Sequence, residues 1–405
     1  MPALCLYFQV HQPLRLKKYR MFDIGHDHQY FNDSSDSNRN NLKILSKVAA
    51  KSYLPTNAIL AKILKNYPQF KVSFSFSGVF LEQLETHLPH VLESFQSLVN
   101  TGRVEILSET YYHSLSFLYS PEEFASQIKL HQAKVKKLFR AHPQVFRNTE
   151  LIYNNDLAKY VESLGFKGIL AEGVDHILGW RSPNFVYQPH GTKAIKLLLK
   201  NYRLSDDIAF RFSSHDWPEY PLTAPKFASW INGVNGSGEV VNLFMDYETF
   251  GEHQWADTGI FDFLASFPGQ ILKHPDNSFV TPSEAIDTYP IRDTLDIPNF
   301  ISWADVERDL SAWLGNPMQH DALHHLYSLE SQVLRTKDYS LIDDWRKLQI
   351  SDHFYYMCTK WFSDGDVHKY FNPHDTPYEA FISFMNALQD LKLRISQSTS
   401  SNITI

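Results

Sequence analysis

Short apolar runs that alternate with helical patterns are the feature of this sequence that most limits its fold. The runs are rich in β-branched and aromatic residues and have the length of strands. Strand, helix, strand repetition is typical of parallel β/α architecture, and this many units favour a closed barrel. Seven runs are expected as strands: Leu4 to Val10, Val72 to Phe76, Val104 to Leu107, Phe146 to Ile152, Phe166 to Ala171, Ile208 to Phe212 and Val240 to Met245.

An open doubly wound sheet is the alternative fold. Such sheets often carry a Gly-rich phosphate loop after their first strand. Here His11-Gln12-Pro13 follows the first run instead, so the barrel is favoured.

Two segments between the runs have clear helix signals. Ser120-Pro121-Glu122-Glu123 forms a capping box with proline at the first helical position, and apolar residues follow at helical spacing. Asn155 to Leu164 has the pattern of a second amphipathic helix, which Gly165 ends.

The strand pattern stops near Pro282. Helical patterns that carry tryptophan and leucine replace it, as in Trp303 to Leu314 and His320 to Thr336. We therefore expect a barrel domain over residues 1–281 and a mostly helical C-terminal domain over residues 282–405.

Composition excludes several classes of function. The net charge of −7 argues against nucleic acid as a partner, because phosphate binding requires a basic face. No stretch has the length and apolarity of a membrane span, and the basic residues follow the first apolar run, the reverse of a secretory signal. Two cysteines, Cys5 and Cys358, cannot form a disulfide framework. These features predict a cytoplasmic protein.

Ionisable residues follow several of the expected strands. Because the carboxyl ends of parallel barrel strands meet at one rim, these side chains should converge there. Clustered like charges cost stability, so such a cluster indicates a functional site. Two facing carboxylates can cleave a glycosidic bond, one attacking the anomeric carbon while the other protonates the leaving oxygen. The residues at these positions are His11, Glu109, Glu150, Glu172 and Asp246.

Five segments in this order resemble the signature regions of glycoside hydrolase family 57. The fourth has the DYETFGEH form of the family's α-amylase group. The resemblance implies an incomplete, seven-stranded (β/α) barrel followed by a helical domain, acting on α-1,4-glucans with retention of configuration. The segments are His11-Gln12-Pro13, Gly102 to Leu107, Arg147 to Tyr153, Phe244 to Gly251 and Leu348 to Met357.

The resemblance also implies roles for individual residues. Glu150 matches the nucleophile and Asp246 the general acid/base, with Glu248, Glu252 and His253 as support for the acid. His11 would hydrogen-bond a sugar hydroxyl, and Asp352 with His353 would enter the cleft from the helical domain. Further contacts to substrate are expected from Glu109 at the rim and from sugar-stacking tryptophans, for which Trp180, Trp217, Trp255 and Trp303 are the candidates.

Three other functions remain open at this point. A 4-α-glucanotransferase or branching enzyme would use the same carboxylates with a sugar as acceptor. A metal-dependent polysaccharide deacetylase would need an Asp and two His ligands, for which Asp23 with His26 and His28, or His324-His325, are the nearest candidates. A non-catalytic glucan-binding protein is the third. We expect hydrolysis of a starch- or glycogen-type glucan or a maltooligosaccharide, without a metal or other cofactor.

Overall fold

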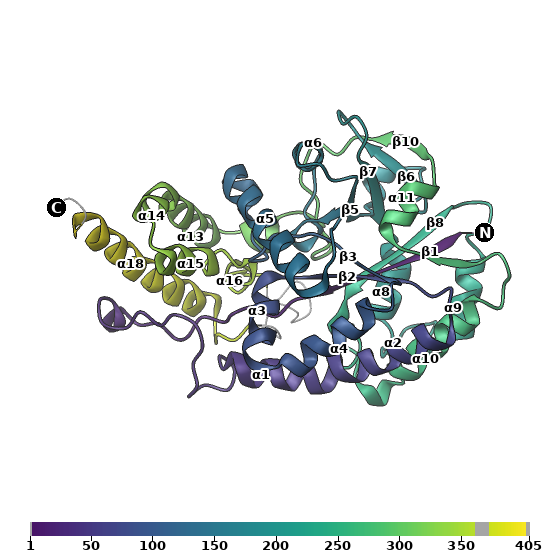
Figure 1. Ribbon diagram of the computed structural model, residues 1–405, viewed down its shortest axis with the longest axis horizontal. Coiled ribbons are helices and arrows are strands. Elements are labelled where there is room, and N and C mark those ends of the chain that lie inside the picture. Colours follow the sequence, from purple (N-terminus) through teal and green to yellow (C-terminus); the bar gives the residue numbers. More distant parts are fainter. Residues whose placement is uncertain (1, 361–371, 402–405) are drawn as a thin grey trace. The chain divides into compact units, whose positions relative to one another are not determined.

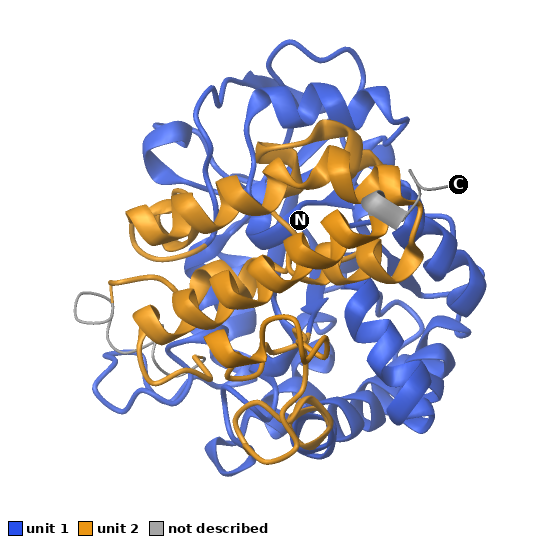
Figure 2. Ribbon diagram, turned by 90° about the vertical axis from the view of Figure 1, so that its left-hand side faces the viewer, with its two compact units in different colours: residues 1–11, 46–109, 128–303 blue, residues 12–45, 110–127, 304–405 orange. Residues whose placement is uncertain are grey.

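The computed structural model describes residues 2–360 and 372–401, which form two compact units (Figure 2). Unit 1 comprises residues 1–11, 46–109 and 128–303, and unit 2 comprises residues 12–45, 110–127 and 304–405. Unit 1 therefore extends past the expected boundary at residue 281, as far as Trp303. Unit 2 also takes in two segments from the N-terminal half of the chain.

Parallel strands form the centre of unit 1 (Figure 1). In the first sheet, β1 (Ala3–Val10) pairs with β2 (Val72–Phe76) and β8 (Val240–Asp246), and β2 pairs with β3 (Val104–Ile106). In the second, β5 (Gly168–Glu172) lies between β4 (Val145–Arg147) and β7 (Lys196–Lys200).

Short contacts join the two sheets into a ring. Between β3 and β4, the Ser108 amide donates to the Val145 carbonyl (3.0 Å), and the Arg147 amide donates to the Ser108 carbonyl (2.9 Å). Between β7 and β8, the Asn201 amide donates to the Asn242 carbonyl (2.9 Å). The order β1-β2-β3-β4-β5-β7-β8 is thus an incomplete barrel of seven parallel strands, as expected from the sequence.

One of the seven strand predictions was wrong. Residues 208–212 are not a strand, because α8 (Tyr202–Ala209) covers the start of this run. The sixth barrel strand is instead β7, whose sequence KLLLK carries a lysine at each end. Three further strands lie outside the ring: β6 (Val186–Pro189) pairs with β7, β10 (Ile291–Leu295) with β6, and β9 (Ser278–Val280) with β1.

An apolar cluster fills the barrel. Its members come from six of the seven strand segments, and where one strand contributes two of them they lie an even number of positions apart, as expected for side chains that share one face. The inward-facing members include Tyr7, Leu107, Val145, Leu170, Leu198 and Phe244.

Helix α11 (Pro282–Thr288) contributes Ala285 and Ile286 to the same cluster. The carboxylate of Glu105 accepts the Ser283 amide (2.9 Å) at the first turn of this helix. At its other end, the Lys196 ammonium donates to the Tyr289 carbonyl (2.9 Å). An acid at the N-terminus and a lysine at the C-terminus both complement the helix dipole. Glu105 therefore has a structural role, and α11 belongs to the barrel rather than to a separate helical domain.

Helices surround these strands in unit 1. The Asn154 side chain caps α6, which begins at Asn155 as predicted and ends at Ser163 before Gly165 in a left-handed conformation. The others are α2 (Leu54–Asn66), α3 (Gly78–His87), α4 (Pro89–Val99), α7 (Asp175–Leu178), α9 (Ala224–Asn232) and α10 (Ile260–Ile271). Both α1 (Asn41–Val48) and α5 (Pro121–Phe139) contain residues of both units.

Unit 2 is mainly helical, as expected for the C-terminal region. The helix predicted over residues 303–314 is limited to α12 (Ser311–Leu314), and that over residues 320–336 is divided in two. The remaining helices are α13 (Pro317–Ser328), α14 (Glu330–Thr336), α15 (Tyr339–Lys347), α16 (Ser351–Tyr355) and α18 (Pro377–Ser401).

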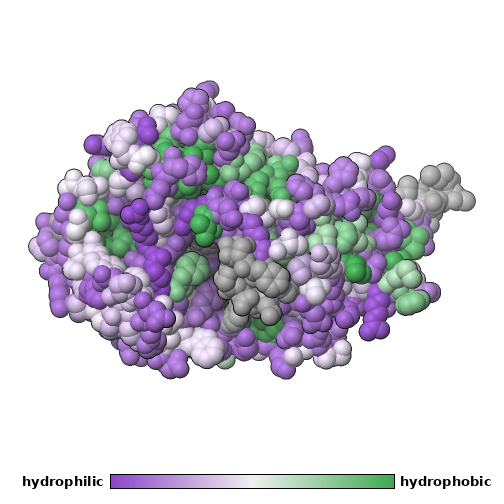
Figure 3. Space-filling model, turned by 180° about the vertical axis from the view of Figure 1, so that it is seen from behind, coloured by the Kyte–Doolittle hydropathy of each residue, from purple (hydrophilic) through white to green (hydrophobic). Residues whose placement is uncertain are grey.

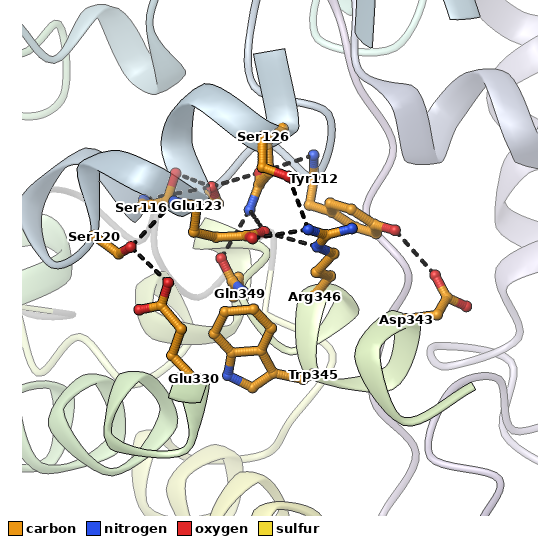
Figure 4. A network of polar contacts seen from close by, with 12 residues as sticks. Tyr112, Ser116, Ser120, Glu123, Ser126, Glu330, Asp343, Trp345, Arg346 and Gln349 are labelled. Atoms are coloured by element: carbon orange, nitrogen blue, oxygen red, sulfur yellow. Dashed lines mark hydrogen bonds and ion pairs between the residues drawn. The ribbon is translucent and has the colours of Figure 1, made fainter. Parts of the chain in front are cut away.

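A buried polar network joins the 110–127 segment to α15 within unit 2 (Figure 4). The Arg346 guanidinium donates from Nε (2.8 Å) and Nη2 (2.9 Å) to the two carboxylate oxygens of Glu123. Gln127 donates to Gln349 (2.8 Å) beside this pair. The bidentate geometry satisfies a charge that would otherwise be costly to bury.

One face of the molecule is mostly polar. On the face shown in Figure 3, hydrophilic side chains predominate and hydrophobic ones form small groups. Among the described residues, no helix has both the length and the apolarity to cross a membrane.

Gly251, in the DYETFGEH segment, lies close to the backbone of Lys51, and its replacement tests this close packing. Its φ is +103°, and a Cβ there would lie 2.1 Å from the Lys51 carbonyl oxygen. We expect Gly251→Ala to destabilise the protein by several kcal/mol, measured by chemical unfolding, because backbone would have to move.

Gly236→Ala is the matched control. Gly236 also has a positive φ (+79°), but no atom lies within 4 Å of its added Cβ. It should cost only about 1–2 kcal/mol. Equal losses in the two variants would contradict the close approach at Gly251.

Candidate active site

Five charged residues extend the inward-facing face of the barrel at the carboxyl ends of its strands. Each lies two positions beyond an inward apolar residue, so strand alternation directs it to the same side. They follow Leu107, Val145, Leu170, Leu198 and Phe244 respectively and are Glu109, Arg147, Glu172, Lys200 and Asp246.

The sign of the charge alternates around this part of the rim. Arg147 Nη1 lies 3.8 Å from Glu109 Oε2, and Lys200 Nζ lies 3.3 Å from Glu172 Oε2. These four side chains are buried. Asp246 is half-buried and follows Lys200 in strand order. Two cations thus stand between three acids, which offsets the repulsion that the acids alone would produce.

Polar residues of β1 and β2 continue the rim. The Tyr7 hydroxyl lies 2.7 Å from Ser75 Oγ, and His11 Nδ1 lies 2.6 Å from Ser77 Oγ. Burial raises the pKa of Tyr7, Arg147 opposes this rise, and Glu109 and Asp246 add to it. One hydroxyl therefore lies within the electrostatic reach of charges from β3, β4 and β8.

Glu150 has an uncommon backbone conformation directly after β4. Its φ is +56° and that of Leu151 is +51°, in the left-handed region that residues other than glycine seldom adopt. Consecutive residues of this kind form a tight turn, η4 (Thr149–Leu151), which leaves the Glu150 side chain half-buried. Strain of this sort is often found at functional sites.

Trp303 holds both the backbone and the side chain of Glu150. The Trp303 amide donates to the Glu150 carbonyl (3.1 Å), and the indole Nε1 donates to Glu150 Oε2 (2.6 Å). Close to this contact in the sequence, Tyr153 and Ile301 form an antiparallel bridge, which joins the chain after Glu150 to the chain before Trp303. The half-buried Trp303 therefore contacts the proposed nucleophile directly, and a stacking role toward sugar stays a prediction.

Two rim cations lie near the Trp303 ring. The Arg147 guanidinium carbon is 5.0 Å from the ring centroid and Lys200 Nζ is 5.4 Å from it. Both distances are within the range of a cation–π interaction. Trp303 therefore connects Glu150 to the charges at the ends of β4 and β7.

The three acids of the DYETFGEH segment have different surroundings. Asp246 ends β8 on its inward face, whereas Glu248 is buried and accepts a hydrogen bond from the Tyr53 hydroxyl. Glu252 forms ion pairs with Lys47 (2.8 Å) and Lys51 (3.2 Å). Glu248 is thus not a plain surface acid, and of these three acids Asp246 faces the barrel interior.

His253, at the end of this segment, is half-buried, and burial lowers its pKa to about 4 although Glu252 opposes the shift. Its amide donates to the Glu248 carbonyl (2.9 Å). Glu248 and His253 therefore stabilise the loop after β8, while contact with substrate remains a prediction for both.

The other expected binding residues have varied surroundings. Trp180 is 87% exposed. Trp217 is half-buried, 6.1 Å from the Trp230 ring. In unit 2, α16 carries Asp352 and the buried His353, whose ring stacks on Phe31. Sugar contacts by these residues remain predictions.

The rim cations Arg147 and Lys200 were not identified from the sequence. The signal that could have found them is alternation, since each lies two residues beyond an inward apolar side chain of its strand. For Lys200 the signal was hidden, because the strand that carries it was not recognised.

A metal-ligand cluster was the requirement of the deacetylase hypothesis. Within the described ranges, no three or more His, Cys, Asp or Glu side chains are grouped so as to hold a metal ion. His28, one of the candidate ligands, instead pairs with Asp390 (2.9 Å) in unit 2. The set of ligands that this hypothesis needs is therefore not found among these residues.

Comparison with known proteins agrees with this barrel. The model of glycosyl hydrolase family 57 matches residues 5–298. A protein of Methanocaldococcus jannaschii named "Putative alpha-amylase" is 44% identical over 402 residues, which cover 96% of this chain and 84% of that protein.

Two solved structures share the fold at low sequence identity. A branching enzyme of Pyrococcus horikoshii superimposes with a TM-score of 0.68 at 16% identity, over 91% of this chain and 87% of that one. A 4-α-glucanotransferase of Thermococcus litoralis gives 0.64 at 18% identity over 87% of this chain. The present chain spans only 56% of the glucanotransferase's length.

The buried His131 beneath the rim gives a prediction on pH. Its Nε2 donates to the Phe76 carbonyl (2.8 Å), so Nδ1 is the acceptor for the Glu109 amide (3.4 Å). Burial lowers the pKa of His131, which Glu109 partly opposes. The unfolded chain therefore takes up this proton first as the pH falls below about 6.5, and stability is lost there.

We expect His131→Gln to make the unfolding free energy less dependent on pH below about 6.5. The exposed His142 supplies the control, and His142→Gln should leave the dependence unchanged. Chemical unfolding at a series of pH values measures both. An unaltered slope in the His131 variant would contradict a neutral, buried imidazole.

Proposed function

Because this chain belongs to glycoside hydrolase family 57, we propose that it cleaves α-1,4-glucosidic bonds with Glu150 as nucleophile and Asp246 as general acid/base. The substrate would be a starch- or glycogen-type glucan or a maltooligosaccharide. The proposal includes no cofactor and no metal.

The observation that most supports it is the conformation of Glu150. A strained left-handed turn places this carboxylate at the rim, and Trp303 binds it through a hydrogen bond of 2.6 Å. A donor of this kind favours the ionised carboxylate, which is the form that attacks carbon. Asp246 ends β8 at the carboxyl rim of the barrel and is half-buried, a position suited to a general acid.

The proposed reaction has two displacements. In the first, a Glu150 oxygen attacks the anomeric carbon while Asp246 gives its proton to the leaving glycosidic oxygen, which yields a glycosyl ester. In the second, Asp246 takes a proton from water while the water oxygen attacks the anomeric carbon. The bond between this carbon and the Glu150 oxygen breaks, which releases Glu150 as a carboxylate. Two inversions give net retention, so the first product should be the α-anomer.

Hydrolysis and glycosyl transfer share the ester and differ in the group that attacks it. The 44% identity with a protein named for amylase activity favours water as acceptor. Likeness to a branching enzyme and a glucanotransferase supports the shared fold alone, because both are under 25% identical. A transfer reaction is therefore the second candidate.

Replacement of Glu150 tests the nucleophile. We expect Glu150→Gln to lose turnover of maltoheptaose by at least about a thousandfold and to keep sugar binding, because the amide retains the shape but cannot form the ester. Reducing-sugar release and calorimetric titration measure the two effects. Turnover near that of the wild type would remove Glu150 from this role.

Glu150→Gly offers a rescue experiment. Glycine readily adopts the positive φ of this position, so the fold should tolerate it. Added azide should restore turnover of an activated aryl α-maltoside and form the β-azide. Failure of rescue in a folded variant would speak against direct attack by Glu150.

Asp246→Asn tests the proton donor. The variant should lose most of its activity on maltoheptaose and much less in the first step on aryl glycosides with acidic leaving groups, since these need little protonation. Burst kinetics with 2,4-dinitrophenyl maltoside measures that step. Equal losses on both substrates would contradict general acid catalysis by Asp246.

The products decide between hydrolysis and transfer. Incubation of the wild type with maltoheptaose should give only shorter oligosaccharides, as separated by chromatography. Longer or cyclic products would instead assign a transferase, with the same carboxylates in the same roles.

A further inference from the structure

We propose that Arg147 is a positioning residue that acts through Trp303 to hold Glu150 ionised and in place for attack. The inference rests on the proposed function, because it assumes that Glu150 is the attacking carboxylate. It adds a residue for which neither the strand-end pattern nor the family resemblance gave a role.

The first argument is the cost of burying Arg147. Its side chain has no exposed surface, and none of its three guanidinium nitrogens has a hydrogen-bond partner among the described residues. A buried charge of this kind is expensive unless it is fully paired. The ion pair with Glu109, at 3.8 Å, is longer than a hydrogen bond.

Arg346 shows how a partly buried arginine is paired when its role is structural. It donates two hydrogen bonds, of 2.8 Å and 2.9 Å, to Glu123. Arg147 lacks that geometry, so stabilisation of the fold does not account for its charge. Poorly compensated charges of this kind are found where function requires a local field.

The second argument is the path from Arg147 to Glu150. The guanidinium carbon lies 5.0 Å from the Trp303 ring centroid, and the Trp303 indole donates to Glu150 Oε2. A cation near the ring withdraws electron density from the indole and so strengthens its N–H as a donor. The positive charge also attracts the carboxylate directly. Both effects favour ionised Glu150.

Other charges of unit 1 bear on the same carboxylate. Lys200, 5.4 Å from the Trp303 ring centroid, acts in the same direction as Arg147. Acids oppose both cations, and Lys200 is itself paired with two of them, at 3.3 Å and 3.0 Å. The charged and titratable groups of this part of the barrel are Lys200 with Glu172 and Asp206, Arg147 with Glu109, Asp246, Tyr7, His11 and His131.

Lys200 is thus neutralised more fully than Arg147. Its ammonium is shared by Glu172 and Asp206, whereas among the described residues Arg147 pairs with one acid, at a longer distance. Arg147 should therefore contribute more to the field at Glu150. This difference is why Arg147, and not Lys200, is assigned the role.

The test is the dependence of kcat/KM on pH, with maltoheptaose as substrate. Its acidic limb reports loss of the ionised nucleophile in the free enzyme. We expect Arg147→Met and Trp303→Phe each to move this limb to higher pH by about one unit. Arg147→Lys, which keeps the charge, should move it much less. The double variant should move it by less than the sum of the two single shifts, because the effect that passes through the indole is lost only once.

Arg203→Met is the matched control. Arg203 also lies near an aromatic ring (5.7 Å from the Tyr202 centroid) and pairs with an acid, Asp175 (3.0 Å), but it is exposed. Its variant should keep the limb of the wild type. If Arg147→Met does not fold, as judged by circular dichroism and melting, Arg147→Gln keeps a polar side chain and carries the same expectation.

Unshifted limbs in the Arg147 and Trp303 variants would overturn the inference, even if activity fell equally at every pH, because a merely structural role predicts that uniform loss. Glu150→Gln separates this failure from failure of the proposed function. An inactive Glu150→Gln with unshifted limbs removes only the role of Arg147. An active Glu150→Gln removes the nucleophile itself.

Discussion

Trp303 binds Glu150 at two points, and the geometry of the proposed site depends on this contact. Consecutive left-handed residues cost about 1–2 kcal/mol each, so the turn at Glu150 and Leu151 is held against its own strain. A hydrogen bond to a charged acceptor contributes about 1.5–3 kcal/mol, which is of the same size. The indole and amide of Trp303 therefore suffice to keep a strained carboxylate in one orientation.

The barrel determines which side chains surround that carboxylate. Along each strand, every second residue faces inward, so an apolar interior ends in a charged layer at the carboxyl rim. Opposite signs on neighbouring strands let four buried charges coexist. At the amino end, Glu105 and Lys196 bind the two ends of α11. The same alternation of inward-facing side chains thus provides the residues that bind α11 at the amino end and the charged residues at the carboxyl end.

Much of this could be predicted from the sequence. Six of the seven barrel strands were found as apolar runs, the capping box at Ser120 marked the start of α5, and an amphipathic pattern identified α6. The strand β7 was missed because its two inward lysines make KLLLK look like a short, charged segment. The apolar spacing in residues 208–212 has a period of two, yet packing makes residues 202–209 helical.

Only part of the candidate site could be predicted from the sequence. Glu150 and Asp246 were identified by position and by family resemblance. The contact of Trp303 with Glu150 joins residues 153 positions apart, and no local pattern reports such a pairing. Arg147 adjoins the resembling segment but looks like an ordinary strand residue until its burial is known. Long-range contacts and desolvation are properties of the folded chain, so neither the Trp303–Glu150 contact nor the burial of Arg147 can be read from the sequence.

The most direct test of the account is to trap the covalent intermediate. A 5-fluoro-α-maltosyl fluoride carries a good leaving group, and its ring fluorine slows hydrolysis of the ester, so the glycosyl enzyme should accumulate. Peptide mass spectrometry should then locate one maltosyl adduct on Glu150. An adduct on another carboxylate, or none in an enzyme that turns over maltoheptaose, would contradict the assignment.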